Sequence, residues 1–132
     1  MPKKQQYKVV YIEDDQDMID LVEVILSRGD FELFGVTEGR EGLNTIHRVK
    51  PDLVLLDLML PDMGGWAIHQ QMKKEEALRD IPVIVVTAQD APVDKLLGEH
   101  IAKVKVYITK PFSPTQLLQS VNDVLGIESQ IE

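Results

Sequence analysis

The sequence predicts an α/β fold in which five parallel strands form a doubly wound sheet with helices on both faces. Three observations predict it. Short apolar runs rich in β-branched residues alternate along the whole chain with segments whose apolar residues recur at helical spacing. The strongest apolar runs are unbroken, which is typical of parallel strands covered on both faces. No internal repeat or low-complexity segment interrupts the alternation.

The first half of the chain predicts three strands and two helices. "YKVVYI" (7–12) is the first strand, and apolar residues at i, i+3, i+4, i+7 and i+8 predict the helix after it: Met18, Leu21, Val22, Ile25 and Leu26. "FELFGV" (31–36) is the second strand. A helix near 39–49 ends before Pro51, because a residue that precedes proline disfavours the helical conformation. "DLVLLD" (52–57) is the third strand.

The second half predicts three helices and two strands. The helices are expected at 64–78, near 91–102 and at 114–125, and the strands at 81–87 and 103–109. The start of the last helix carries the clearest local signal. Ser113 precedes Pro114, and Gln116 follows three residues after the serine, which together are typical of a capped helix start.

The apolar patterns of the five strands predict their order in the sheet. "VVYI", "LVLL" and "VIVV" are continuous and should be central, whereas "FELFGV" and "KVKVYI" carry alternating polar residues and should form the edges. This gives the strand order 2-1-3-4-5 of a flavodoxin-like sheet. In that order the topological switch point lies between strands one and three, and ligands bind beyond the carboxyl ends of the strands there.

Length and composition favour one domain, expected over residues 1–132 with its core at 7–125. The absence of cysteine excludes disulfides, thiolate metal sites and cysteine nucleophiles. Because 22 acidic residues outweigh 14 Lys and Arg, giving a net charge of −8, we expect no direct nucleic-acid or membrane partner. No apolar run is long enough to span a membrane and no signal-type segment follows the start, so we expect a cytoplasmic protein.

Acidic side chains follow two strands that the predicted order makes neighbours. Glu13 and Asp14 come directly after strand one, and Asp57 ends strand three. Two carboxylates about 4 Å apart repel by roughly 4 kcal/mol at an effective dielectric constant near 20, and a divalent cation relieves this repulsion. Oxygen ligands without His or Cys favour Mg²⁺, Mn²⁺ or Ca²⁺ over zinc, and a site with few protein ligands plus waters and a phosphate suits Mg²⁺ best. The alternative is a solvated acidic loop in which Asp15 caps the next helix.

Two further polar residues end strands at the same edge. Thr87 closes strand four and offers a hydroxyl, and Lys110 follows strand five and offers an ammonium group. Carboxylates, a cation, a hydroxyl and a lysine around one point are the groups that phosphoryl transfer requires. Asp57 is then the acceptor of the phosphoryl group.

The stretches "VVYIEDD", "PDLVLLDLMLPDMGG", "IPVIVVTA" and "YITKPF" resemble the receiver domain of two-component response regulators across residues 7–125. The resemblance implies that Asp57 is phosphorylated by a histidine kinase or a phosphotransfer protein. It also implies that Glu13, Asp14, Asp57 and the backbone carbonyl of Met59 hold Mg²⁺.

The same resemblance assigns roles at strands four and five. Thr87 matches the hydroxyl that bonds the phosphoryl group, Lys110 the lysine that pairs with it, and Tyr107 the aromatic residue that changes rotamer. The bond from Lys110 to Pro111 matches one that is cis in this family. The chain departs from the family at Lys103 and Val104, where receivers commonly have a Gly-Ala turn.

The resulting interpretation is a phosphorelay receiver that switches conformation to control an unknown downstream partner and catalyses only its own phosphorylation and dephosphorylation. Formation of a homodimer on phosphorylation is compatible with this interpretation. Met59 and Gln89 should flank the path of the hydrolytic water, and the apolar Met59 predicts slow loss of phosphate.

Two other functions share part of this pattern. Haloacid-dehalogenase-type phosphatases also use a strand-end aspartate with Mg²⁺, but they need a second aspartate where this chain has Met59. A receiver-like interaction module that takes no phosphate is the second alternative. Nothing in the sequence favours it, because all the residues for the chemistry are present.

Overall fold

The structure is a computed structural model that describes residues 6–88 and 106–127. The helix expected near 91–102 and the first residues of the strand expected at 103–109 lie outside the described residues. So does Gln89.

Five parallel strands form one sheet, in the order β2-β1-β3-β4-β5. Their bounds are Tyr7–Ile12 for β1, Phe31–Val36 for β2, Leu53–Leu56 for β3, Val83–Ala88 for β4 and Val106–Lys110 for β5. All four residues of β3 are buried, and β2 and β5 are the edges, as the sequence predicted. The predicted flavodoxin-like order is therefore confirmed.

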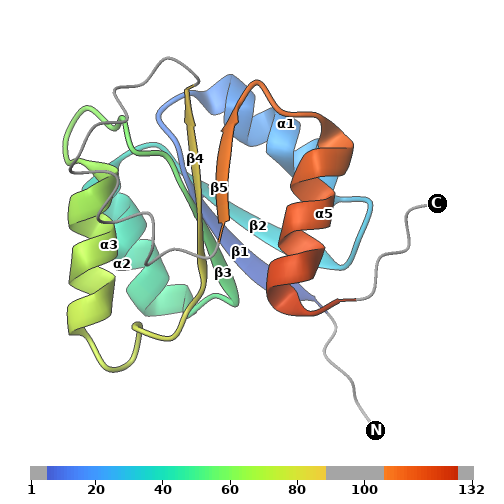
Figure 1. The fold of residues 1–132 in the computed structure, drawn as a ribbon. Helices are drawn as coiled ribbons and strands as arrows, with labels where there is room; N and C mark the ends of the chain where they lie inside the picture. The colour runs from blue at the N-terminus through green and yellow to red at the C-terminus, as the bar shows by residue number, and fades with distance from the viewer. Residues whose placement is uncertain (1–5, 89–105, 128–132) are drawn as a thin grey trace, which may run out of the picture.

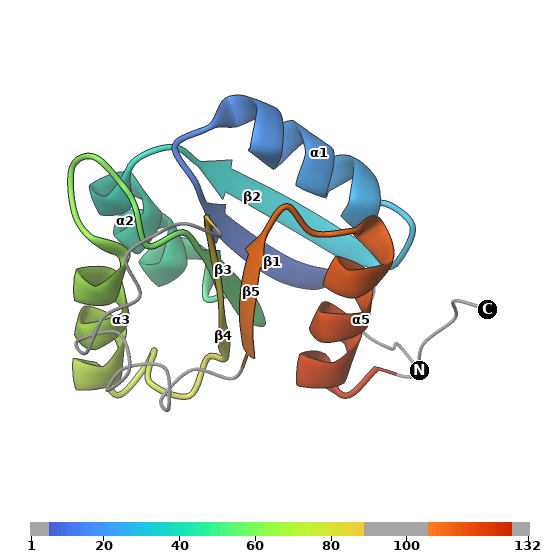
Figure 2. The same ribbon diagram turned by 45° about the horizontal axis from the view of Figure 1, so that its top comes forward.

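Four described helices cover the two faces of the sheet. Their bounds are Gln16–Leu26 for α1, Gly39–Val49 for α2, Gly65–Lys74 for α3 and Pro114–Leu125 for α5. Helices α1 and α5 lie on one side of the sheet, and α2 and α3 lie on the other (Figure 1). The tilted view of Figure 2 shows the same separation.

The core divides into two clusters because successive side chains of a strand point to opposite faces of the sheet. On β1, Val9 and Tyr11 pack on the side of α1 and α5, whereas Val10 and Ile12 pack on the side of α2 and α3. Each cluster takes buried residues from several strands and from the helices of its own side.

The two predicted helix caps are present. The side chain of Asp15 accepts a hydrogen bond of 3.0 Å from the backbone N–H of Asp17 at the start of α1. Ser113 Oγ accepts one of 3.0 Å from the N–H of Gln116 at the start of α5. These bonds satisfy N–H groups that a helix leaves without a partner in its first turn.

Helix α3 ends at Lys74, so the prediction that it extends to residue 78 was wrong. Leu78 follows Met72 by six residues, which places it about 240° round an ideal helix and off the buried face. The chain instead leaves the helix at Glu75, whose carbonyl accepts hydrogen bonds from the N–H groups of Leu78 and Arg79. This turn lets Leu78 be fully buried.

Candidate functional site

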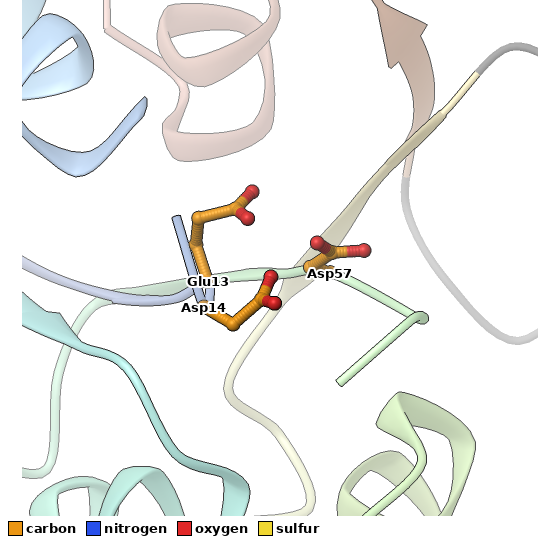
Figure 3. A group of neighbouring side chains, drawn as sticks. All are labelled: Glu13, Asp14 and Asp57. Atoms are coloured by element: carbon orange, nitrogen blue, oxygen red, sulfur yellow. The ribbon is translucent and has the colours of Figure 1, made fainter. Parts of the chain in front are cut away.

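Three carboxylates gather at the carboxyl ends of β1 and β3. Glu13 and Asp14 follow β1, Asp57 follows β3, and the two strands are paired so that Ile12 lies opposite Leu56. One carboxylate oxygen from each acid lies within 4.8 Å of the others (Figure 3). Glu13 and Asp57 are buried, with 1% and 3% of their surface exposed, whereas Asp14 is exposed. The structure thus brings together the three acids that strand order predicted to be neighbours.

Lys110, the last residue of β5, reaches into this cluster. Its Nζ donates to Glu13 Oε1 at 2.6 Å and to Asp57 Oδ2 at 3.3 Å. The lysine therefore bridges two carboxylates that come from different strands, and its shorter bond is to Glu13. The peptide bond from Lys110 to Pro111 is cis.

Glu13 has two further donors besides the lysine. The hydroxyl of Tyr11 donates to Glu13 Oε1 at 2.9 Å, and the backbone N–H of Asp15 donates to Oε2 at 3.1 Å. Sequence reasoning missed Tyr11. The sequence does contain a signal for this contact. Residues 11 and 13 of an extended chain face the same side, and a tyrosine in an otherwise aliphatic strand end needs a partner for its hydroxyl.

Burial and pairing shift the pKa values of this group. Burial raises the pKa of Glu13 above its usual value, although the hydrogen bond from Lys110 acts in the opposite direction. Burial opposes the charge of Lys110, but the carboxylates of Glu13 and Asp57 hold its pKa above the ordinary lysine value. Burial and the neighbouring Glu13 raise the pKa of Tyr11 far above its usual value, so its hydroxyl keeps its proton and stays a donor.

The loop after Asp57 folds back onto its side chain. The backbone N–H of Met59 donates to Asp57 Oδ1 at 2.9 Å, which places the backbone of Met59 beside the acid. The side chain of Met59 points outward and is 53% exposed. Both oxygens of Asp57 therefore have protein donors, Met59 on one and Lys110 on the other.

Two anchors that sequence reasoning missed hold this loop. Asp62 accepts hydrogen bonds from the N–H groups of Gly39 and Arg40, at 2.8 and 3.2 Å, and so caps the start of α2 from a distant part of the chain. These bonds lower the pKa of Asp62. At Gly65, an added Cβ would lie 2.5 Å from the carbonyl oxygen of Asp57, so α3 begins in direct contact with the backbone of the acid.

Thr87 and Tyr107 lie on the neighbouring strands β4 and β5. Val85 pairs with Tyr107 and Thr87 with Thr109, so the threonine lies two residues further toward the carboxyl edge on the same face as the tyrosine. That face is the side of α2 and α3, where Tyr107 packs. Thr87 is fully buried, and the hydroxyls of both residues have no hydrogen-bond partner among the described residues.

The donor set fits a magnesium ion. It consists of carboxylate oxygens, which suit hard divalent cations, and no described histidine or cysteine belongs to the group. When all four side chains are charged, one lysine faces three carboxylates, and a dication balances the excess negative charge.

A family model described as the response regulator receiver domain matches residues 9–122. The chain belongs to this family. Solved structures agree with the assignment. This receiver domain is 32% identical to the N-terminal domain of a response regulator receiver protein from Methanoculleus marisnigri, with a TM-score of 0.71, over 92% of this chain and 98% of that one.

Two further receiver structures are similar. A CheY-like response regulator receiver domain protein from Methanospirillum hungatei is 26% identical, with a TM-score of 0.81, over 92% of this receiver domain and 94% of that chain. The receiver domain of a sensor histidine kinase from Pseudomonas aeruginosa shares the fold at 23% identity and a TM-score of 0.81, over 92% and 98% of the two chains. That structure has a magnesium ion coordinated in its active-site cleft.

Receiver domains are the phosphoacceptor modules of two-component signalling. Among the residues that the structure describes, no helix has the length and apolar character needed to cross a membrane.

Proposed function

We propose that this receiver domain accepts a phosphoryl group on Asp57 from a sensor histidine kinase or a phosphotransfer protein, and that it then switches conformation to control a downstream partner. It acts in the cytoplasm as a single domain over residues 1–132, with its core at 7–125. The observation that supports the proposal best is that Asp57 bonds Lys110 and lies within 4.8 Å of carboxylate oxygens of the two other acids.

Glu13, Asp14, Asp57 and the backbone carbonyl of Met59 would hold Mg²⁺. When bound, the cation offsets the negative charge of the transferring phosphoryl group. The burial of Asp57 and Glu13 strengthens such charge interactions, because the local dielectric constant is lower than that of water.

The reaction transfers a phosphoryl group in line. The N–P bond of a phosphohistidine breaks, an O–P bond forms with a carboxylate oxygen of Asp57, and the imidazole leaves with the electron pair of the broken bond. Lys110, already 3.3 Å from Asp57 Oδ2, is placed to bond the transferred group. Hydrolysis of the acyl phosphate later restores Asp57, so the domain catalyses only its own phosphorylation and dephosphorylation.

Thr87 and Tyr107 are the proposed switch. A charge-assisted hydrogen bond from Thr87 to the phosphoryl group would contribute roughly 1.5–3 kcal/mol, which corresponds to a population shift of about ten- to a hundredfold. The proposal is supported by the buried hydroxyl of Thr87, which lacks a partner among the described residues. Moving Thr87 makes room for Tyr107, which lies on the same face of the sheet.

The test is phosphorylation by acetyl phosphate with Mg²⁺, followed by intact-mass measurement. We expect the wild type to gain one phosphoryl group and Asp57→Asn to gain none. Asp30→Asn, which removes an exposed acid before β2, should be phosphorylated as the wild type is. Phosphorylation of Asp57→Asn to the wild-type level would contradict the proposed acceptor.

A further inference from the structure

Tyr11 is unusual among the residues of β1 that approach the site. Val9, Val10 and Ile12 fill the core with aliphatic side chains, whereas Tyr11 brings a hydroxyl into a position with 0% exposure. Its ring packs in the cluster on the side of α1 and α5. An aliphatic residue would fill such a position without needing a hydrogen-bond partner. The hydroxyl therefore has its effect where it bonds, at Glu13.

Glu13 Oε1 accepts two hydrogen bonds, one from Tyr11 at 2.9 Å and one from Lys110 at 2.6 Å. A carboxylate oxygen has two lone pairs, so these donors saturate it. The lysine is the closer donor, and its bond to Asp57 is longer, at 3.3 Å. In this structure Lys110 is thus held mainly by Glu13 and must loosen that bond to pair with a phosphoryl group on Asp57.

Loosening the bond has a cost for Glu13. A buried carboxylate oxygen that loses its ammonium partner and keeps no other donor is destabilised, because at 1% exposure water does not replace the lost bond. The Tyr11 hydroxyl is an uncharged donor to the same oxygen and does not depend on where Lys110 lies. It can keep Glu13 Oε1 hydrogen-bonded after the lysine has turned away.

We propose that Tyr11 is a positioning residue of the phosphoacceptor site, whose hydroxyl holds Glu13 Oε1 and thereby allows Lys110 to transfer from Glu13 to the phosphoryl group on Asp57. The proposal rests on the proposed function, because it concerns the phosphorylated state. Tyr11 acts through Glu13 and does not itself touch the phosphoryl group.

The test compares Tyr11→Phe with Tyr7→Phe. Tyr7 lies on the same strand and the same face, but at the opposite end of β1, where its ring packs 6.0 Å from that of Phe31. Both changes remove one phenol hydroxyl and keep the ring, and thermal unfolding shows whether both variants fold. Two affinities are then measured by calorimetry: that for Mg²⁺ alone, and that for beryllofluoride, a phosphoryl mimic, at saturating Mg²⁺.

We expect Tyr11→Phe to bind beryllofluoride about three- to tenfold more weakly than the wild type, which is the range of one net hydrogen bond. Its affinity for Mg²⁺ alone should change by less than about twofold, because Lys110 still pairs with Glu13 in that state. Tyr7→Phe should match the wild type in both. The ¹³C shift of the Glu13 carboxylate should respond to beryllofluoride more strongly in Tyr11→Phe than in the wild type.

Two outcomes would overturn the role of Tyr11 and leave the proposed function standing. In one, the wild type and Tyr11→Phe bind beryllofluoride equally. In the other, Tyr11→Phe loses affinity for Mg²⁺ and for beryllofluoride by the same factor, which is the result of a general disturbance of the acids. If the wild type itself does not bind beryllofluoride with Mg²⁺, the proposed function fails, and the role of Tyr11 fails with it.

Discussion

Lys110 Nζ lies 2.6 Å from Glu13 Oε1 and 3.3 Å from Asp57 Oδ2, so the lysine at the end of β5 is bonded more closely to the acid that follows β1 than to the proposed acceptor. The positive charge of its ammonium group therefore offsets part of the negative charge that would attract a metal ion. Lysine and cation act on the same carboxylates, and removing one should change the binding of the other.

Lys110→Met is expected to strengthen Mg²⁺ binding on the order of tenfold, because a positive charge beside the acids is removed. The same variant should bind beryllofluoride at least about tenfold more weakly, since a charged donor to the phosphoryl mimic is lost. Calorimetric titrations measure both. Lys74→Met, a change at the exposed end of α3, is the control. Parallel losses of both affinities in Lys110→Met would contradict this account.

Gly65→Ala should damage the site, whereas Gly64→Ala should not. The new Cβ at residue 65 would lie 2.5 Å from the carbonyl oxygen of Asp57, while the one at residue 64 would meet nothing within 4 Å. We expect Gly65→Ala to lower the free energy of unfolding by about 1–3 kcal/mol and to weaken Mg²⁺ binding. Gly64→Ala should stay within about 1 kcal/mol of the wild type. Equal effects in urea unfolding and Mg²⁺ titration would show that the contact with Asp57 is unimportant.

Asp62→Ala should destabilise the domain in a pH-dependent way. Hydrogen bonds from Gly39 and Arg40 lower the pKa of the folded carboxylate below that of the unfolded chain. Its contribution to stability is therefore present above the unfolded pKa of about 3.9 and is lost as the pH falls through the lower folded value. The difference in urea midpoint between wild type and variant should be largest near neutral pH and should shrink in that acidic range.

Glu76→Ala is a suitable control for the Asp62 experiment, because it also removes one exposed negative charge but no helix cap. A midpoint difference for Asp62→Ala that stays constant from neutral to acidic pH would mean that the bonds to the start of α2 do not depend on the carboxylate charge.

Met59→Asn is expected to shorten the lifetime of the phosphorylated domain. The side chain of Met59 is 53% exposed beside Asp57 and offers an approaching water no strong hydrogen-bond partner, whereas an amide offers both a donor and an acceptor. We expect about two- to tenfold faster loss of phosphate. The measurement is the decay of the phosphorylated mass with time after the phosphodonor is removed. Met59→Leu, which stays apolar, should decay as the wild type does.

Sequence patterns predicted the strand order and the meeting of Glu13, Asp14 and Asp57, because both follow from general rules. Continuous apolar runs mark central strands, and the carboxyl ends of parallel strands share one edge. The end of α3 was missed although helical periodicity signals it, because Leu78 lies off the helix face that carries Ile68 and Met72 and is buried only after the chain leaves the helix.

The sequence placed Lys110 at the same edge as the acids, but it did not predict which acid the lysine bonds, nor the helix cap that Asp62 makes. The bond of Asp62 to Gly39 spans 23 residues and that of Lys110 to Glu13 spans 97, so each depends on how whole elements pack. Tyr11 is different. Its contact with Glu13 spans two residues along one strand, and a search for polar groups on alternate positions would have found it.

Two tyrosines near the site pack on opposite faces of the sheet. Tyr11, the donor to Glu13, packs on the side of α1 and α5, whereas Tyr107 packs on the side of α2 and α3. Under the proposed function, substitutions in the first layer should change the phosphorylation of Asp57, and substitutions in the second should change the proposed switch at Thr87 and Tyr107. Because these two half-cores share only the sheet between them, substitutions in one are expected to leave the packing of the other largely unchanged.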